Sequence, residues 1–566
     1  MSGAIAKVLG RVRGMLPRRA DYADVPRTWR TDVVAGLTVG VVALPLALGF
    51  GIATGLGAQA GLVTAIVAGL VAAVFGGSNV QVSGPTGAMT VVLVPVVAHF
   101  GAGAVMIVGL MAGVLVIIAA FAGVGRYLAF IPWPVVEGFT IGIAAIIFLQ
   151  QVPTALGVPK PAGENTAAIA VRAVGDALGG AGTWQALALV ALVAVIMVGS
   201  ARLHRAIPGS LLAVVVATVV ASVANLNVTL IGALPAGLPA PSLPSVSAGQ
   251  LSELLSAALA VALLAGLESL LSAKVADGMS DAAPHDPDRE LFGQGLANLV
   301  TPLFGGMPAT GAIARTAVNV RSGGRTRLAA ITHALVLVAV VYLGGSLVAE
   351  IPLAALAGVL MVTACRMVDV HGVRMVLRST RGDAAVLLLT AAATIAFDLI
   401  VAVEIGVAVA ALLALRAVAR NASATAEPVA ATGPGFGADG VTPDEEQELL
   451  SEHILTYRLD GALFFGAAQR FLAELTAVHG VQVVILRLPD LQVLDATGAQ
   501  ALGEIVAQLE ARGITVLLKG PRPEHLRVLE AVGVLDRLAH ERHLFDDLDA
   551  AIAHARLHVA RSEHAA

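Results

Sequence analysis

Ionisable residues stand inside two apolar stretches of this chain, where they are expensive to keep. Glu268 lies within Ala257–Lys274, a stretch long enough to cross a membrane. A carboxylate at that depth costs several kcal/mol unless a function retains it. Further along the chain, Arg315 follows Pro308 and Gly311, which interrupt a second apolar segment. An acid and a base beside broken helices together predict an ion pathway.

Two apolar segments share one arrangement, a break followed by a short apolar run. In the first, Gly84 and Pro85 break the chain and a short helix is expected from Thr86; the second starts at Pro308. Two such segments at corresponding places indicate an inverted repeat, with substrate at the midplane between two helix N-termini. Since these N-termini carry partial positive charge, the expected ligand is an anion. The alternative is that the breaks only kink ordinary membrane helices.

The composition is that of a membrane protein. The chain has 566 residues, of which 57% are hydrophobic and 13% charged, and its mean hydropathy is +0.85, whereas soluble domains carry about 25% charged residues. A formal net charge of −4 gives no bias toward nucleic acid. The single cysteine excludes an internal disulfide framework. No nucleophile–base constellation or metal-ligand spacing is evident, so we expect neither an enzyme nor a metal site, and no cofactor.

Fourteen hydrophobic segments are expected to form membrane helices. They cover 33–53, 59–75, 84–100, 103–123, 132–151, 184–200, 208–225, 254–274, 291–304, 309–320, 327–348, 352–366, 383–398 and 400–419. Basic residues gather in alternate loops, while the proline-rich loop Asn225–Gln250 has none. The positive-inside rule therefore predicts that both termini are cytoplasmic.

A change of composition after Arg420 predicts a second domain. We expect a cytoplasmic N-terminal segment 1–30, a transmembrane domain 31–420 and a flexible linker 421–450. The linker consists largely of small and acidic residues with Pro and Gly. From 451 to 560, strands alternate with amphipathic helices. The predicted fold class is an all-α polytopic membrane domain followed by a small cytoplasmic α/β domain.

Several motifs carry a resemblance to a known family. The membrane part contains LPLALGF, FGGSNVQVSGPTGAMTVV, LESLLSAKVAD, DRELFGQGLANLVTPLFGG and ARTAVNVRSGGRTR. Together these resemble the SulP family of anion transporters, bacterial relatives of human solute carrier family 26, and the nearest branch is that of the bicarbonate transporters. The segment VLDATGAQAL resembles the loop–helix signature of a STAS domain. The resemblance implies two inverted seven-segment repeats, a core domain moving against a gate domain, and a homodimer in the inner (plasma) membrane.

The function implied by the resemblance is secondary active transport of an inorganic anion of the bicarbonate or sulfate class, coupled to H⁺ or Na⁺. The partners implied are this anion and the lipid bilayer, with no nucleic acid. The alternative is a passive anion channel or an anion exchanger on the same scaffold.

The resemblance also implies an anion pocket between the third and tenth segments, closed by the first. The residues at these positions are Phe50, Thr86, Gly87, Gly311, Ala312, Ile313 and Arg315. Thr86 offers a hydroxyl, Arg315 a delocalised positive charge, and Phe50 an apolar wall. The backbone N–H groups of Gly87, Ala312 and Ile313 are the expected further donors. The alternatives are a lipid-facing or core role for Phe50 and a structural ion pair for Arg315.

Glu268 and Ser272 are the residues expected to bind the coupling ion. Sodium-dependent bicarbonate transporters of the family carry Asp and Thr at these two positions and another Thr where this chain has Ile313. Hard cations need several oxygen ligands, so the loss of one disfavours sodium. A carboxyl group that moves between apolar surroundings and water can instead bind and release a proton. Protons are favoured, and sodium remains open.

Two further sets of polar residues have expected roles. Glu290, Gln294 and Asn298 share one helix face at four-residue spacing, which predicts a polar packing face. Thr497 stands where related regulatory proteins carry a phosphorylatable serine. It is therefore a candidate regulatory residue, the alternative being that it caps a helix with Asp495.

Overall fold

The protein divides into two compact units, each described here by itself. They are Met1–Val407 and Ala408–Ala566. The computed structural model describes residues 13–128, 132–163, 166–178, 181–203, 208–233, 237–243, 248–280, 283–396, 405–413, 423–427, 453–463, 481–538, 540 and 543–563.

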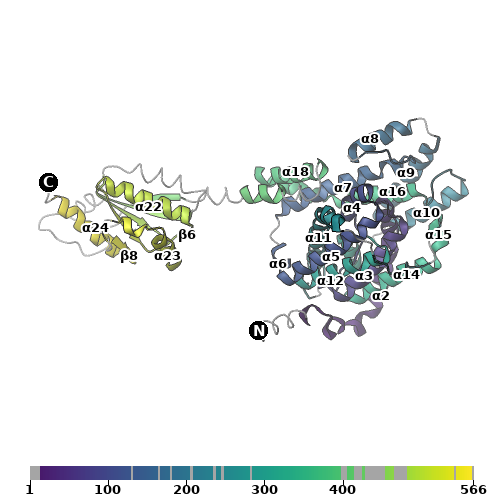
Figure 1. The fold of residues 1–566 in the computed structure, drawn as a ribbon, viewed down its shortest axis with the longest axis horizontal. Coiled ribbons are helices and arrows are strands. Elements are labelled where there is room, and N and C mark those ends of the chain that lie inside the picture. The colour runs from purple at the N-terminus through teal and green to yellow at the C-terminus, as the bar shows by residue number, and fades with distance from the viewer. Residues whose placement is uncertain are drawn as a thin grey trace. The chain divides into compact units, whose positions relative to one another are not determined.

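The first unit is helical, as predicted (Figure 1). Its elements are η1 (Arg19–Tyr22), α2 (Val25–Ala53), α3 (Ala58–Phe75), β1 (Ser83–Gly84), α4 (Gly87–Phe100), α5 (Ala102–Ala122), α6 (Gly125–Leu128), α7 (Trp133–Ala155), α8 (Thr166–Ala177), α9 (Ala181–Leu203), α10 (Gly209–Val223), α11 (Ala248–Asp277), α12 (Pro287–Val300), η2 (Thr301–Phe304), β2 (Thr310–Gly311), α13 (Ile313–Arg321), α14 (Arg327–Leu343), α15 (Gly345–Ala349), α16 (Leu353–Met367), α17 (Val370–Ser379) and α18 (Arg381–Ala396).

Each predicted segment up to 383–398 has a helical counterpart, and 405–413 of the last segment is also helical. The short amphipathic helices α8 and α17 were not predicted as segments, because they are too short and too polar to cross a membrane.

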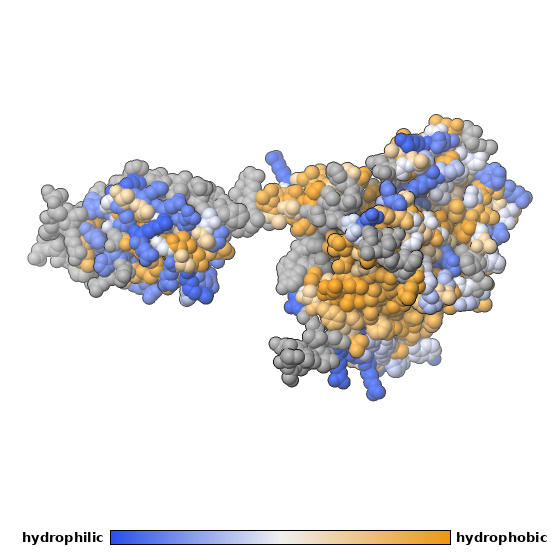
Figure 2. Space-filling model, in the orientation of Figure 1, coloured by the Kyte–Doolittle hydropathy of each residue, from blue (hydrophilic) through white to orange (hydrophobic). Residues whose placement is uncertain are grey.

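Within the described residues, seven helices are long and apolar enough to cross a membrane. They are Val25–Ala53, Ala58–Phe75, Ala102–Ala122, Trp133–Ala155, Gly182–Ser200, Leu251–Asp277 and Leu353–Ser379. Side chains such as Val34, Ile118 and Val195 are exposed on these helices. Figure 2 shows a broad hydrophobic surface on this unit, whereas hydrophilic and hydrophobic residues are mixed on the coloured part of the C-terminal unit. Such an apolar outer surface is suited to lipid.

The two broken segments meet in a short antiparallel pair of strands. β1 pairs with β2 in the register Ser83↔Gly311 and Gly84↔Thr310. Each strand leads directly into a short helix, α4 after β1 and α13 after β2. The pairing therefore brings together the N-termini of two helices that lie far apart in the sequence.

Three polar side chains of α12, which the spacing predicted to share one face for packing, bond to residues before and within this strand pair. Glu290 Oε2 accepts hydrogen bonds from the N–H groups of Gly77 (2.8 Å) and Ser78 (3.1 Å). Gln294 Nε2 donates to Ser83 Oγ at 2.6 Å. Asn298 bonds to both backbone groups of Ala309. Its Nδ2 donates to the Ala309 carbonyl at 2.9 Å, and its Oδ1 accepts from the Ala309 N–H at 2.8 Å. These bonds replace the partners that irregular backbone would otherwise lack inside a membrane.

The second unit is a small α/β domain, as predicted. Its elements are β3 (Ser423–Glu427), β4 (Ile454–Leu463), β5 (Val483–Arg487), β6 (Leu491–Leu494), α22 (Ala496–Ala511), β7 (Thr515–Lys519), α23 (Pro523–Ala531), η3 (Leu535–Arg537), β8 (Leu544–Phe545) and α24 (Leu548–Glu563). The sheet order is β3-β4-β5-β7-β8, with β6 also beside β4. All pairs are parallel except β3–β4.

The range 421–450, predicted as a linker, contains β3. Those five residues belong to the sheet, because they pair with β4 from Ser423↔Asp460 to Glu427↔Thr456. Residues 428–450 lie outside the described residues.

Candidate functional site

The site is built around the start of α4. Thr86 is the N-cap of this helix, and its Oγ1 accepts a hydrogen bond from Met89 N at 3.4 Å. The same hydroxyl donates to Glu268 Oε2 of α11 at 2.9 Å. Two residues that the sequence placed in separate sites, one for the anion and one for the coupling ion, are therefore in direct contact.

Arg315 is buried in the first turn and a half of α13, with 3% of its surface exposed. Its Nη2 donates to the carbonyl of Pro85 at 2.6 Å. Gly84 makes room for it, because a Cβ at this position would lie 2.5 Å from Arg315 Nη1. The charges of Arg315 and Glu268 lie near enough to interact. The guanidinium thus holds the break before α4 and faces the acid of α11.

Phe50 of α2 forms an apolar wall at the same place. It is buried, and a Cβ on Gly87 would lie 3.3 Å from Phe50 Cε1 and collide with Ile147 of α7. The first residue of α4 must therefore be small. The burial of Phe50 excludes a lipid-facing position and places it beside the N-terminus of α4, as the resemblance implied, and a core role remains the alternative to an anion site.

The residues before α13 are arranged differently from the prediction. The N–H of Ala312 donates to Val82 O at 2.9 Å, so it is already used in the strand pair and is not available to an anion. The N–H of Gly311 donates to Ser269 Oγ at 2.9 Å. The prediction of Ala312 as a free donor was wrong, because the pairing of two distant strands could not be derived from local sequence. Ile313, in contrast, begins the helix with 39% of its surface exposed.

The Ser272 hydroxyl donates its hydrogen to α13 and not to Glu268. It is fully buried, and its Oγ donates to Thr316 Oγ1 at 3.1 Å, which in turn accepts from Val82 N at 3.0 Å. Ser272 therefore fastens α13 and the first strand to α11. The four-residue spacing places Glu268 and Ser272 on one helix face, but the Ser272 hydroxyl is hydrogen-bonded to Thr316 of α13.

Sequence reasoning missed three polar residues beside the site. Ser269 bonds to Thr310 Oγ1 at 2.9 Å as well as to Gly311. Gln81 is buried with both amide atoms unpaired among the described residues, and its amide lies where a Cβ of Gly311 would be. His333 of α14 is buried near Arg315 with both ring nitrogens likewise unpaired. A glutamine three residues before the Gly84-Pro85 break in apolar sequence is the signal that could have found Gln81.

Thr497 is the exposed second residue of α22. Asp495 alone caps that helix, since its Oδ1 accepts from Gly498 N at 2.7 Å. The hydroxyl of Thr497 is therefore not the cap, and a regulatory role for it stays a prediction.

Comparison with known families assigns both parts of the chain. The profile of the Sulfate permease family matches residues 29–390. The STAS domain profile matches residues 450–551.

Relatives of full length are named as transporters. YvdB of Bacillus subtilis (strain 168), named as a candidate sulfate transporter, is 34% identical over 92% of this chain and 97% of its own length. The bicarbonate transporter BicA of Picosynechococcus sp. (strain ATCC 27264 / PCC 7002 / PR-6) is 31% identical over 91% of this chain and 93% of its own. These names agree with the prediction of a transporter rather than an enzyme.

Solved structures show the same fold. The transmembrane domain of a cyanobacterial BicA matches with a TM-score of 0.58 at 32% identity, covering 68% of this chain and 97% of that one. SLC26A9 matches with a TM-score of 0.80 at 17% identity, covering 99% and 96%, which speaks for the fold alone. With broken segments that meet at β1 and β2, an α/β domain matched by the STAS profile, and a family match over most of its length, this chain belongs to the sulfate permease family.

Proposed function

We propose that this protein is a secondary active transporter of a small inorganic anion of the bicarbonate or sulfate class, coupled to protons. The observation that carries the proposal is the hydrogen bond from Thr86 to Glu268 at the N-terminus of α4, beside the buried Arg315. It supports a direct link between a group that can take up a proton and a group that can bind an anion.

The anion site consists of donors from both broken segments. Gly87 and Ile313 begin the two short helices, and their N–H groups lie at the positive ends of the helix dipoles. Arg315 has five N–H donors and uses one for Pro85, so it can offer others to an anion. Phe50 closes the site on its apolar side. A site made of helix dipoles and one guanidinium favours small inorganic anions over organic ones. The names of YvdB and BicA support sulfate or bicarbonate.

Protonation of Glu268 has a definite consequence for Thr86. A hydroxyl has one hydrogen and two lone pairs. While Glu268 is ionised, the Thr86 hydrogen is directed to the carboxylate. When Glu268 binds a proton, it becomes the donor, and the Thr86 hydroxyl can turn its hydrogen toward an anion. Proton binding and anion binding then favour each other, which is the thermodynamic condition for symport.

The oxygen atoms around Glu268 support protons over sodium. Ser272 bonds to Thr316, and Ile313 contributes no side-chain oxygen. A sodium ion wants several oxygen ligands, and in the described residues the side chain bonded to Glu268 is that of Thr86 alone. We further propose that the transport cycle moves a core domain against a gate domain in a homodimer, with both termini on the cytoplasmic side of the inner membrane.

Uptake into proteoliposomes tests the proposal. Bicarbonate, sulfate and a small dicarboxylate are each supplied under an imposed pH gradient at fixed sodium, and under a sodium gradient at fixed pH. We expect concentrative uptake of an inorganic anion that follows the pH gradient alone. Uptake that follows only the sodium gradient would refute proton coupling. Anion flux without accumulation of the anion inside the vesicles would indicate a channel or an exchanger.

A further inference from the structure

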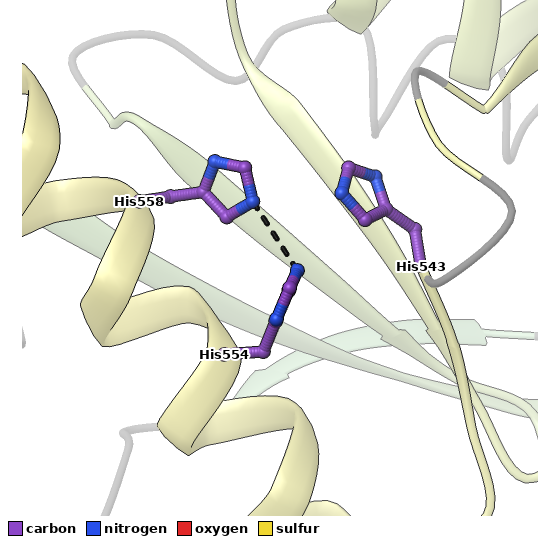
Figure 3. A group of neighbouring side chains, drawn as sticks. All are labelled: His543, His554 and His558. Carbon is purple, nitrogen blue, oxygen red and sulfur yellow. Dashed lines mark hydrogen bonds between the residues drawn. The ribbon is translucent and has the colours of Figure 1, made fainter.

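Three histidines gather at one edge of the C-terminal domain, in the unit that holds none of the residues assigned to transport. His543 directly precedes β8, and His554 and His558 lie one turn apart on α24 (Figure 3). One nitrogen from each ring lies within 4.8 Å of those of the other two. The ring centroids of His543 are 5.4 Å from His554 and 5.3 Å from His558.

The fold places these rings together for simple reasons. α24 packs the apolar residues Ala551, Ile552 and Ala555 against β5 and β7. His554 and His558, at i and i+4, share one face of the same helix. β8 pairs with β7 through Leu518↔Leu544, which fixes His543 beside α24. The third histidine is thus supplied by a different element, which is why the sequence did not predict a metal site.

The geometry of the pair on α24 suits a tetrahedral metal. The Nε2 atoms of His554 and His558 are 3.3 Å apart. Two ligand nitrogens bound to Zn²⁺ at 2.0–2.1 Å in a tetrahedron are separated by about 3.3–3.4 Å. Pairs of histidines at i and i+4 on one helix face are a known arrangement for zinc.

His543 adds a second, independent observation. The side chain is buried, with 2% of the residue exposed, and its Nδ1 has no hydrogen-bond partner among the described residues. A buried ring nitrogen without a partner is costly unless something unseen satisfies it. His554 and His558 are only half-buried, which leaves a route from solvent.

We propose that His543, His554 and His558 bind a divalent first-row transition metal, with Zn²⁺ the best match, and that this metal clips α24 to the edge of the sheet at β8. Three imidazoles are a ligand set suited to Zn²⁺, and they leave a fourth position for water. The alternative is a hydrogen bond between two neutral histidines of α24 with no metal.

The test uses the full-length protein in detergent, purified through a tag without histidines and stripped with a chelator. Co²⁺ is titrated as the spectroscopic probe, and bound Zn²⁺ is measured by mass spectrometry after desalting. We expect one equivalent of metal per chain and the intense visible absorption of tetrahedral Co²⁺. In the double variant His554→Gln/His558→Gln, affinity should fall by more than about 100-fold, because even outer-shell partners are worth up to that factor.

The matched control is His453→Gln, a change directly before β4 that removes a histidine outside the cluster. It should bind metal as the wild type does. Absence of metal binding in the wild type, or equal binding in the wild type and the double variant, overturns the proposal. Far-UV circular dichroism checks folding; if the double variant misfolds, the single change His558→Gln at a half-buried ring must give the same loss.

Discussion

Arg315 carries a positive charge and connects the two broken segments. It belongs to α13, yet its Nη2 bonds to the carbonyl of Pro85 before α4, and Gly84 leaves the space it occupies. From the sequence, this arginine is expected either to bind an anion or to form a structural ion pair. The geometry is compatible with both roles, because one donor holds the backbone and a guanidinium has further donors for a ligand.

Replacing Arg315 by Ala should weaken anion binding about 10- to 100-fold. A hydrogen bond to a charged group contributes roughly 1.5–3 kcal/mol, and the positive charge is lost with it. Isothermal titration of the purified variant measures the affinity. Arg321→Ala, an exposed arginine at the other end of α13, is the control and should bind normally. An unchanged affinity in Arg315→Ala would remove this residue from the site.

The carboxylate of Asp21 attaches the N-terminal segment to α12. It lies in η1 and accepts both terminal guanidinium donors of Arg289, at 2.9 and 2.6 Å. Burial by itself raises the pKa of Asp21, but the hydrogen bonds from Arg289 and the Arg18 backbone and the charge of Arg289 outweigh it, so the pKa lies below its ordinary value of 3.8. Because the pKa of Asp21 is lower in the folded protein than in the unfolded chain, ionised Asp21 stabilises the fold at pH values above 3.8. This stability is lost as the pH falls through the folded pKa.

The variant Asp21→Asn should therefore be less stable than the wild type at pH 6, by about 1–3 kcal/mol, since one partner of a largely buried pair is removed. The difference should shrink as the pH falls below about 4, where wild-type Asp21 also becomes neutral. Thermal unfolding in detergent at several pH values measures it. Asp176→Asn, on the exposed side of α8, controls for a general effect of charge. A difference that does not depend on pH would contradict the assignment.

At the scale of elements, the pairing of β1 with β2 decides where the two short helices begin. Gly311 is the tightest point of this pair, because a Cβ there would collide with the Gln81 amide and lie 3.1 Å from Ser269 Cα. Ser269 Cα is backbone and cannot give way, and the Gln81 side chain, although flexible, is buried and has little room to move. The strand pair therefore requires glycine at this position.

We expect Gly311→Ala to lower the unfolding temperature and to abolish transport, because overpacking typically costs about 1–3 kcal/mol and here displaces the start of α13. Gly345→Ala at the start of α15 meets nothing within 4 Å and should behave as the wild type. Thermal shift and vesicle uptake measure the two effects. Normal transport by Gly311→Ala would show that the strand pair does not set the site.

The sequence was a good guide to where this site lies and a poor guide to how its atoms are bonded. The cost of a buried charge singled out Glu268 and Arg315, and Gly-Pro chemistry predicted the helix breaks. The hydrogen bonds of Ala312 and Ser272 differ from the predicted ones, because their partners Val82 and Thr316 come from other elements. Which hydroxyl or N–H remains free depends on those long-range contacts, and a single sequence does not encode them locally.

At the scale of the whole molecule, the two units have different surfaces and separate cores. The membrane unit buries two large clusters of apolar side chains, and the C-terminal domain has its own. Residues assigned to the anion and the proton all lie in the first unit. This division favours a regulatory or stabilising role for the C-terminal domain.

A chain ending at Arg420 should therefore still insert into the membrane and retain part of its transport. This end point keeps the predicted segment 400–419 and removes β3, which belongs to the sheet of the second unit. Size-exclusion chromatography checks folding, and vesicle uptake measures activity. A folded but fully inactive truncated protein would make the C-terminal domain a required part of the mechanism.

The central claim is that a proton on Glu268 frees Thr86 to bind the anion, and the pH dependence of anion affinity tests it most directly. The affinity for the transported anion is measured by titration calorimetry at several pH values in the wild type, in Glu268→Gln, and in Glu253→Gln, an exposed glutamate of the same helix. Any ionisation of the anion itself is common to all three proteins and cancels in the comparison. The account predicts that affinity rises as pH falls in the wild type and in Glu253→Gln, while Glu268→Gln, which resembles the protonated acid, binds with high affinity at every pH. The same pH dependence in Glu268→Gln as in the wild type would contradict it.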